Sequence, residues 1–203
     1  MDQAKRIIIG FLVAIFLNGF FAGISCGAPY PEGFVGIPWG ASRDQVVKVM
    51  NERGFTTEGT VSSQDQPAST LLYRGAFDGQ PCQLEFYFSS NAMFKGRASH
   101  LGLLQPAGAQ LALYRQLVNL VSAKYGLPQA DKIQEDKTNT GEIWRFGKAE
   151  WLFTVGEAPD KYRIEADLIP PVMYFSKYNK SLGYIFITYT AVSLEERLKF
   201  KEY

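Results

Sequence analysis

The hydrophobic pattern of the chain shows two different periods along its length. Residues 82–88 alternate strictly, with apolar side chains at the even positions and polar or aromatic ones between them, which is typical of a half-buried antiparallel strand. Residues 109–125 repeat apolar side chains every three or four positions, which predicts a helix with one buried stripe. The chain is therefore predicted to be α+β.

Capping residues mark the ends of the other predicted helices. Ser42, with Gln45 three positions later, forms a capping box that opens a helix at 43–53, and a glycine follows it. Ser193, with a glutamate three positions later, predicts a second capping box and a short C-terminal helix at about 194–200.

Seven further segments have strand patterns bounded by turn residues. They are residues 71–77, 81–88, 93–101, 142–146, 150–155, 162–169 and 184–192. Residues 56–69 read as a loop or an irregular strand, and 129–141 as a polar connection. The order predicts two successive helix-then-antiparallel-strand units, with the helices on one face of an antiparallel sheet and a short C-terminal helix.

The N-terminus has the features of an export signal. Lys5 and Arg6 precede an apolar run at 7–21, and small residues follow. The run is shorter than the ~20 apolar residues of a comfortable membrane span, although a retained single-span anchor is the alternative. We predict a signal peptide at 1–25, a proline-rich tether at 26–33 and one α+β domain at 34–203. Its halves would be 34–104 and 105–203.

The cleavage position decides the chemistry of the two cysteines. If Cys26 becomes the first residue, it could be lipidated, although Gly23 stands where lipoprotein signals carry leucine. Without lipidation, Cys26 and Cys82 could form a disulfide in an oxidising compartment. Cleavage after Gly27 leaves Cys82 alone, as a small buried hydrophobe. All three outcomes are compatible with the sequence.

Charge and composition exclude several classes of function. The formal net charge is +1, and removing residues 1–25 leaves 19 basic and 19 acidic side chains. A neutral chain lacks the positive potential on which non-specific nucleic-acid binding depends. The sequence has one histidine, no HExxH pair and no phosphate-binding glycine loop, so we expect no metal site and no cofactor.

Two groups of residues could support hydrolysis. His100, beside Ser99 and with Asp65 and Asp78 elsewhere in the chain, could belong to a triad, although a surface or rim histidine is the preferred interpretation. A cluster of carboxylate residues beside two tryptophans could form a site that cleaves glycans. Its residues are Glu142, Glu150, Glu165, Asp167, Trp144 and Trp151. The preferred interpretation places these carboxylates on the solvent face of strands, so we assign no catalytic residue.

Aromatic residues on the predicted strands could instead form a recognition surface. These are Tyr87, Tyr162, Tyr184 and Tyr189. Tyrosine supplies a large contact area at a small cost in conformational entropy. Packing against the sheet explains them equally well. Trp39, between two glycines and ahead of a capped helix, is predicted to be a packing residue.

Two short motifs support a resemblance to known proteins. The opening Phe34–Ser42 and the helix end Val121–Pro128, with Val121 where leucine is usual, resemble those of uncharacterised secreted bacterial proteins. The helix-plus-sheet unit is similar to β-lactamase-inhibitor-protein-like domains and small outer-membrane assembly lipoproteins. This resemblance implies a binding or scaffold module and supplies no catalytic residues.

We therefore expect an exported, non-enzymatic protein of the bacterial envelope, in the periplasm or attached to the outer membrane. It would bind a protein or another envelope component through its sheet, and would touch the membrane only through a signal or lipid anchor. The alternative is a periplasmic hydrolase that acts on a glycan or peptide, which requires a cleft with converging carboxylates or His100 beside a hydroxyl.

Overall fold

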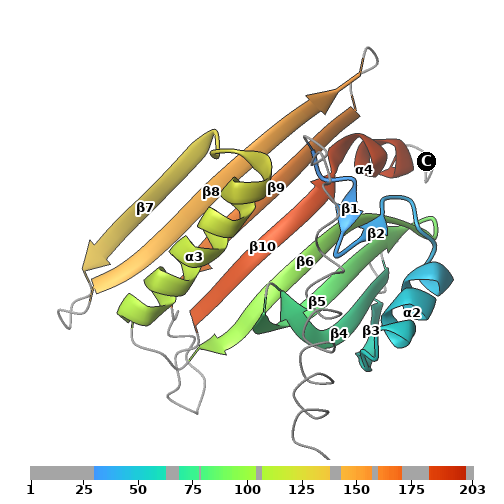
Figure 1. Cartoon of the computed structure of the whole chain (residues 1–203), viewed down its shortest axis with the longest axis horizontal. Coiled ribbons are helices and arrows are strands. Elements are labelled where there is room, and N and C mark those ends of the chain that lie inside the picture. The colour runs from blue at the N-terminus through green and yellow to red at the C-terminus, as the bar shows by residue number, and fades with distance from the viewer. Residues whose placement is uncertain are drawn as a thin grey trace, which may run out of the picture.

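The computed structural model describes residues 30–62, 69–77, 79–103, 107–137, 143–156, 160–170 and 183–199. These residues form an α+β fold with one large antiparallel sheet, a small two-stranded hairpin and three helices (Figure 1). The elements are β1 (Gly33–Phe34), β2 (Ile37–Pro38), α2 (Arg43–Glu52), β3 (Thr57–Ser62), β4 (Ser69–Phe77), β5 (Gln80–Ser89), β6 (Ala92–Leu103), α3 (Ala107–Tyr125), β7 (Ala130–Lys137), β8 (Ile143–Val155), β9 (Asp160–Ile169), β10 (Gly183–Ala191) and α4 (Val192–Lys199).

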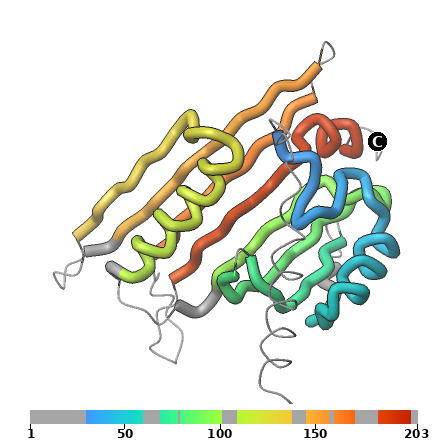
Figure 2. Tube along the Cα trace, in the orientation of Figure 1, coloured from blue at the N-terminus to red at the C-terminus, as the bar shows by residue number. Residues whose placement is uncertain are grey.

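The large sheet has eight strands in the order β3-β4-β5-β6-β10-β9-β8-β7. Each strand pairs antiparallel with its neighbours, so β3 to β6 form one meander and β7 to β10 another. The two meanders join where β10 pairs with β6, and β3 and β7 form the outer edges (Figure 2). The last strand of each meander therefore lies at the centre of the sheet.

One face of the sheet carries the hydrophobic core. Cross-strand pairing aligns Ala98, Ile187, Ala166 and Ala149 in one row, and all four are fully buried. Helix α3 packs on this face against β8, β9 and β10 (Figure 1), and it contributes the buried residues Tyr114, Leu117, Val118 and Val121 to the core. We refer to this side as the core face.

Two glycines in the sheet let large side chains approach the backbone. A Cβ atom on Gly96 would lie 2.2 Å from the ring of Phe34, and one on Gly147 would lie 2.8 Å from the ring of Tyr114. No Cβ atom fits at such distances, so only glycine allows these rings to pack on β6 and β8. Phe34 and Tyr114 thereby fix the β1–β2 hairpin and α3 to the sheet.

Helix α2 begins as the sequence predicts. Ser42 is its N-cap, and both hydrogen bonds of the capping box with Gln45 form. The preceding hairpin is held by two side chains, because the Trp39 indole donates to the Pro31 carbonyl at 2.6 Å and Arg53 donates to the Val35 carbonyl at 2.6 Å. Trp39 packs against the core, in agreement with its predicted role.

Three local predictions differ from the structure. The segment predicted as a polar connection contains the edge strand β7, which pairs with β8 along its length. The strands predicted at 142–146 and 150–155 form one continuous strand, because Gly147 accommodates Tyr114 and does not turn the chain. Helix α4 begins at Val192, so Ser193 lies inside it, and the Ser193 hydroxyl accepts a hydrogen bond from the Lys161 amide at 2.9 Å.

Candidate functional site

The sheet face opposite α3 carries polar and aromatic side chains on five neighbouring strands. We call it the polar face. The register places its residues on the side opposite the core rows. Its members are Gln83, Glu85, Tyr87, Lys95, Arg97, Ser99, Tyr184, Phe186, Thr188, Arg163, Glu165, Asp167, Phe146, Lys148, Glu150 and Leu152. Helix α4 packs against β9, β6, β10 and β5, and its Glu195 and Lys199 lie near enough to act on Lys95 of this face.

Glu85 lies at the centre of a hydrogen-bonded group on β5 and β6. Its carboxylate accepts hydrogen bonds from the hydroxyls of Tyr87 and Ser99. Its Oε2 atom also lies 3.8 Å from Nη1 of Arg97. Only 13% of the Glu85 side chain is exposed, so these partners compensate a carboxylate that has lost most of its water.

Arg97 connects this group to β10. Its guanidinium lies 5.3 Å from the Tyr87 ring and 5.2 Å from the Phe186 ring, and the Lys95 ammonium lies 4.4 Å from the Tyr87 ring. Such cation–π contacts fix the orientation of both cations. Burial, followed by the hydrogen bond and charge of Glu85, raises the pKa of Tyr87, and burial followed by the Arg97 charge lowers the pKa of Lys95.

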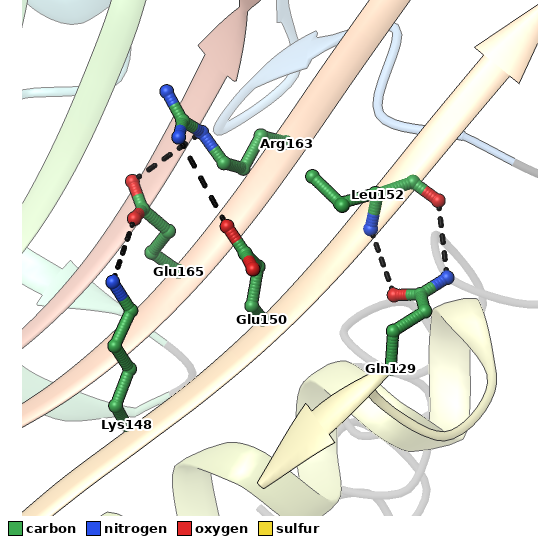
Figure 3. A network of polar contacts seen from close by, with 6 residues as sticks. All are labelled: Gln129, Lys148, Glu150, Leu152, Arg163 and Glu165. Carbon is green, nitrogen blue, oxygen red and sulfur yellow. Dashed lines mark hydrogen bonds and ion pairs between the residues drawn. The ribbon is translucent and has the colours of Figure 1, made fainter.

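A second polar group spans β8 and β9 (Figure 3). Arg163 lies between two carboxylates, 3.9 Å from Glu150 and 3.6 Å from Glu165. Lys148 lies 3.5 Å from Glu165, so the side chains alternate in sign along the face. Glu150 and Glu165 are also direct cross-strand neighbours, and the shared arginine offsets the repulsion that two opposed carboxylates would have.

Asp167 differs from the other carboxylates of the polar face. It is half-buried on β9, between Lys148 and Phe186 in the register. Burial raises the pKa of Asp167, and the nearby Glu165 carboxylate raises it further, while Lys148 and Arg97 lower it. The carboxyl group is therefore protonated more readily than an aspartate in water.

Strand β8 also presents two exposed apolar side chains on the polar face, on either side of Lys148 and Glu150. Leu152 is 50% exposed and Phe146 37% exposed, both on β8. The Gln129 side chain holds the backbone of Leu152 from both sides, accepting from its amide at 2.8 Å and donating to its carbonyl at 3.1 Å (Figure 3). On this strand, charged side chains that are held in ion pairs thus lie beside solvent-exposed apolar ones.

The structure brings together three of the predicted carboxylates. Glu150, Glu165 and Asp167 share the polar face, whereas Glu142 and the side chain of Trp144 lie outside the described residues. Trp151 does not join them, because it lies in the core, where its indole donates to the Gly126 carbonyl at 2.8 Å.

His100 is buried, so its predicted place on the surface is wrong. It is 2% exposed, faces the core opposite Ile185, and its Nδ1 lies 3.1 Å from the Pro81 carbonyl oxygen. Burial lowers the pKa of His100. Ser99 points to the opposite face and donates to Glu85, while Asp65 and Asp78 lie outside the described residues. The strand alternation therefore separates the histidine from its neighbouring hydroxyl.

The four tyrosines divide between the two faces. Tyr87 and Tyr184 lie on the polar face, where Tyr184 stacks with Phe186 at 5.8 Å between ring centroids. Tyr189 is buried on the core face, and Tyr162 stacks with Tyr30 at 5.0 Å. No sequence motif singles out Lys95, Arg97 and Phe186, and the only local signal for their place on the polar face is that each alternates with buried residues on its strand.

The structure describes one of the two cysteines. Cys82 is a buried free thiol on the core face, and burial raises its pKa to about 12, which suppresses thiolate chemistry. Cys26 lies outside the described residues, so lipidation and pairing with Cys82 stay predictions.

Within the described ranges, His, Cys, Asp and Glu side chains form no group of three that could hold a metal ion. No helix in this part of the chain is long and apolar enough to cross a membrane. Comparison with protein families, curated proteins and solved structures found no match.

Proposed function

We propose that this protein is an exported, non-enzymatic binding module of the bacterial envelope, which binds a protein partner through the polar face. The observation that carries the proposal is the composition of that face. Its centre holds Arg97 between two aromatic rings, and its strand β8 exposes Leu152 and Phe146. Arginine and aromatic residues are enriched at the energetic centres of protein interfaces.

The rigidity of the face supports a binding role. Arg163, Glu165 and Lys148 are ion-paired with one another or with Glu150, and Glu85 is hydrogen-bonded from two sides. Side chains that are already ordered lose little conformational entropy when a partner binds. A partner with both charges and an apolar segment would complement such a face.

The proposal also includes export of the protein and a division of its domain into two units. The basic, apolar and small-residue segments at 1–25 support export, with Cys26 as a lipid anchor if it becomes the first residue. We further propose that the domain consists of two successive helix-then-strand units related by a common plan, as in β-lactamase-inhibitor-protein-like domains and small outer-membrane assembly lipoproteins. The two meanders, which meet at β6 and β10, support this division.

Site-specific photo-crosslinking in the native envelope tests the proposal. A photoreactive residue at Leu152 should capture one discrete partner, because this side chain is exposed on the polar face. The same residue at Lys48, exposed on α2 above the core face, is the matched control. Equal capture of the same partner at both positions, or capture at Lys48 alone, would contradict binding through the polar face.

The alternative of a periplasmic hydrolase draws support from the gathering of Glu150, Glu165 and Asp167, with the raised pKa of Asp167 suited to a general acid. Against it, Glu150 and Glu165 are paired with cations, and the two described cavities are lined by other residues. If Glu165→Gln and Asp167→Asn abolished cleavage of peptidoglycan or an envelope peptide by purified protein, the alternative would replace the binding role.

A further inference from the structure

A cavity of about 310 Å³ lies on the core side of the molecule, away from the polar face. It is bounded by α3, the β1–β2 hairpin and the ends of β4 and β10. It is open to solvent on one side, and Val35, Phe77, Leu120, Val121 and Tyr189 supply its apolar side chains, while polar atoms form almost as much of its wall. This volume is at the lower end of small-molecule pockets, which measure roughly 300–1,000 Å³. The cavity therefore fits a small apolar group.

A lysine side chain lies at this cavity. Among the described residues that line it, Lys124 is the only charged one, and its side chain is exposed. The ammonium lies 5.0 Å from the Tyr125 ring and, within the part of the chain that the structure describes, forms no ion pair. A pocket with apolar side chains beside one unpaired cation is complementary to an apolar chain with a negatively charged end.

An adjoining hollow of about 250 Å³ shares Lys124 and Tyr125 with the cavity and adds Glu32 to its lining. Among the described residues, the two hollows thus have one positive and one negative side chain between them. The Glu32 carboxylate repels additional negative charge, so the arrangement favours a head group with a single charge over a phosphate or diphosphate. A carboxylate meets this condition.

The cavity wall also contains strained backbone. Val35 has φ of 44°, in the left-handed region that β-branched residues rarely adopt. The Arg53 guanidinium holds this turn by its hydrogen bond of 2.6 Å to the Val35 carbonyl. Such strain tends to cluster at ligand sites. Here it places the Val35 side chain against the cavity.

We propose that this cavity binds the anion of a medium-chain fatty acid. The acyl chain lies between α3 and the β1–β2 hairpin, and the carboxylate pairs with Lys124. The site is independent of the polar face, so the protein has two binding surfaces on opposite sides of its sheet.

Calorimetric titration of the naturally processed protein, in detergent-free buffer, tests this proposal with decanoate and decanol as probes. Wild-type protein should bind one decanoate saturably. Lys124→Gln should weaken decanoate binding about fivefold, as expected for one partly solvated ion pair, and leave decanol binding unchanged. The matched control Lys48→Gln should bind decanoate like the wild type.

Two further variants fill the cavity. Leu120→Trp and the smaller change Leu120→Phe each enlarge a side chain at its lining and should abolish and weaken, respectively, the binding of both probes. Leu120 is only partly buried, so Leu120→Phe should fold even if Leu120→Trp does not. Absence of saturable decanoate binding, equal affinities of Lys124→Gln and Lys48→Gln, or undiminished binding by folded Leu120→Trp or Leu120→Phe would overturn the proposal. None of these results would change the interpretation of partner capture at Leu152, which tests the polar face separately.

Discussion

Individual contacts between distant residues determine how the sheet is covered. Phe34 packs directly on the backbone of Gly96 and contacts the rings of Phe86 and Tyr189, with centroid distances of 5.4 and 5.6 Å. The glycine has no side chain to contribute to the core, yet its small size decides where the β1–β2 hairpin lies. A hydrophobicity pattern does not identify such a residue, because the need for a glycine at this position comes from the Phe34 ring, in another segment of the chain.

Gly96→Ala should therefore destabilise the protein. The new Cβ would lie 2.2 Å from the Phe34 ring, and overpacking of this kind costs about 1–3 kcal/mol. The free energy of unfolding, measured by urea denaturation, checks this. In a Phe34→Ala background the same substitution should cost less, since the ring is gone. Equal costs in the two backgrounds would show that the contact is not responsible.

Asp167 should make stability depend on pH. Its pKa is raised above the ordinary value of 3.8, so the folded state holds the proton over a range in which the unfolded state has lost it. Stability should fall as pH rises through that range. Asp167→Asn should therefore be more stable than the wild type at pH 7, by less than about 1 kcal/mol because the group is only half-buried, with the gain disappearing in acid.

Gln134→Asn, on the exposed edge strand β7, changes no titratable group and is the control for this prediction. Urea denaturation at several pH values should give a stability difference that varies with pH for Asp167→Asn and a flat one for Gln134→Asn. A stability gain of Asp167→Asn that increased towards low pH would have the wrong sign.

At the scale of elements, local sequence signals predict most boundaries. The capping box of α2 and the strict alternation of β5 involve neighbouring residues, and both are present in the structure. The sequence does not predict strand β7, because this strand has only two apolar residues, as expected of a solvated edge strand. The sequence alone suggests a turn at Gly147, because the residue that requires a glycine there, Tyr114, lies on α3.

The N-cap of α2 gives a prediction at this scale. Ser42→Ala removes the side chain that accepts from the Gln45 amide and should reduce the free energy of unfolding by about 1 kcal/mol. Ser122→Ala, in the interior of α3, should be neutral or slightly stabilising, because alanine is the better helix former. If chemical denaturation shows the same effect for both variants, the cap does not stabilise α2 as described.

At the scale of the whole molecule, the sheet order creates the polar face. Alternation alone predicts that Glu165 and Asp167 share one side of their strand, as they do. It does not predict that β6 pairs with β10, the pairing that brings Arg97 against Phe186. The sequence therefore identifies these carboxylates as a group. It does not identify Arg97 and Phe186, because their contact depends on the pairing of β6 with β10.

The central claim is that the polar face binds the partner, and one comparison of affinities tests it most directly. Lys148→Glu reverses a charge on the polar face, and Lys48→Glu makes the same change on α2. With the partner captured at Leu152, we expect Lys148→Glu to raise the dissociation constant about tenfold or more and Lys48→Glu to leave it unchanged. Equal dissociation constants for the two variants would contradict the account.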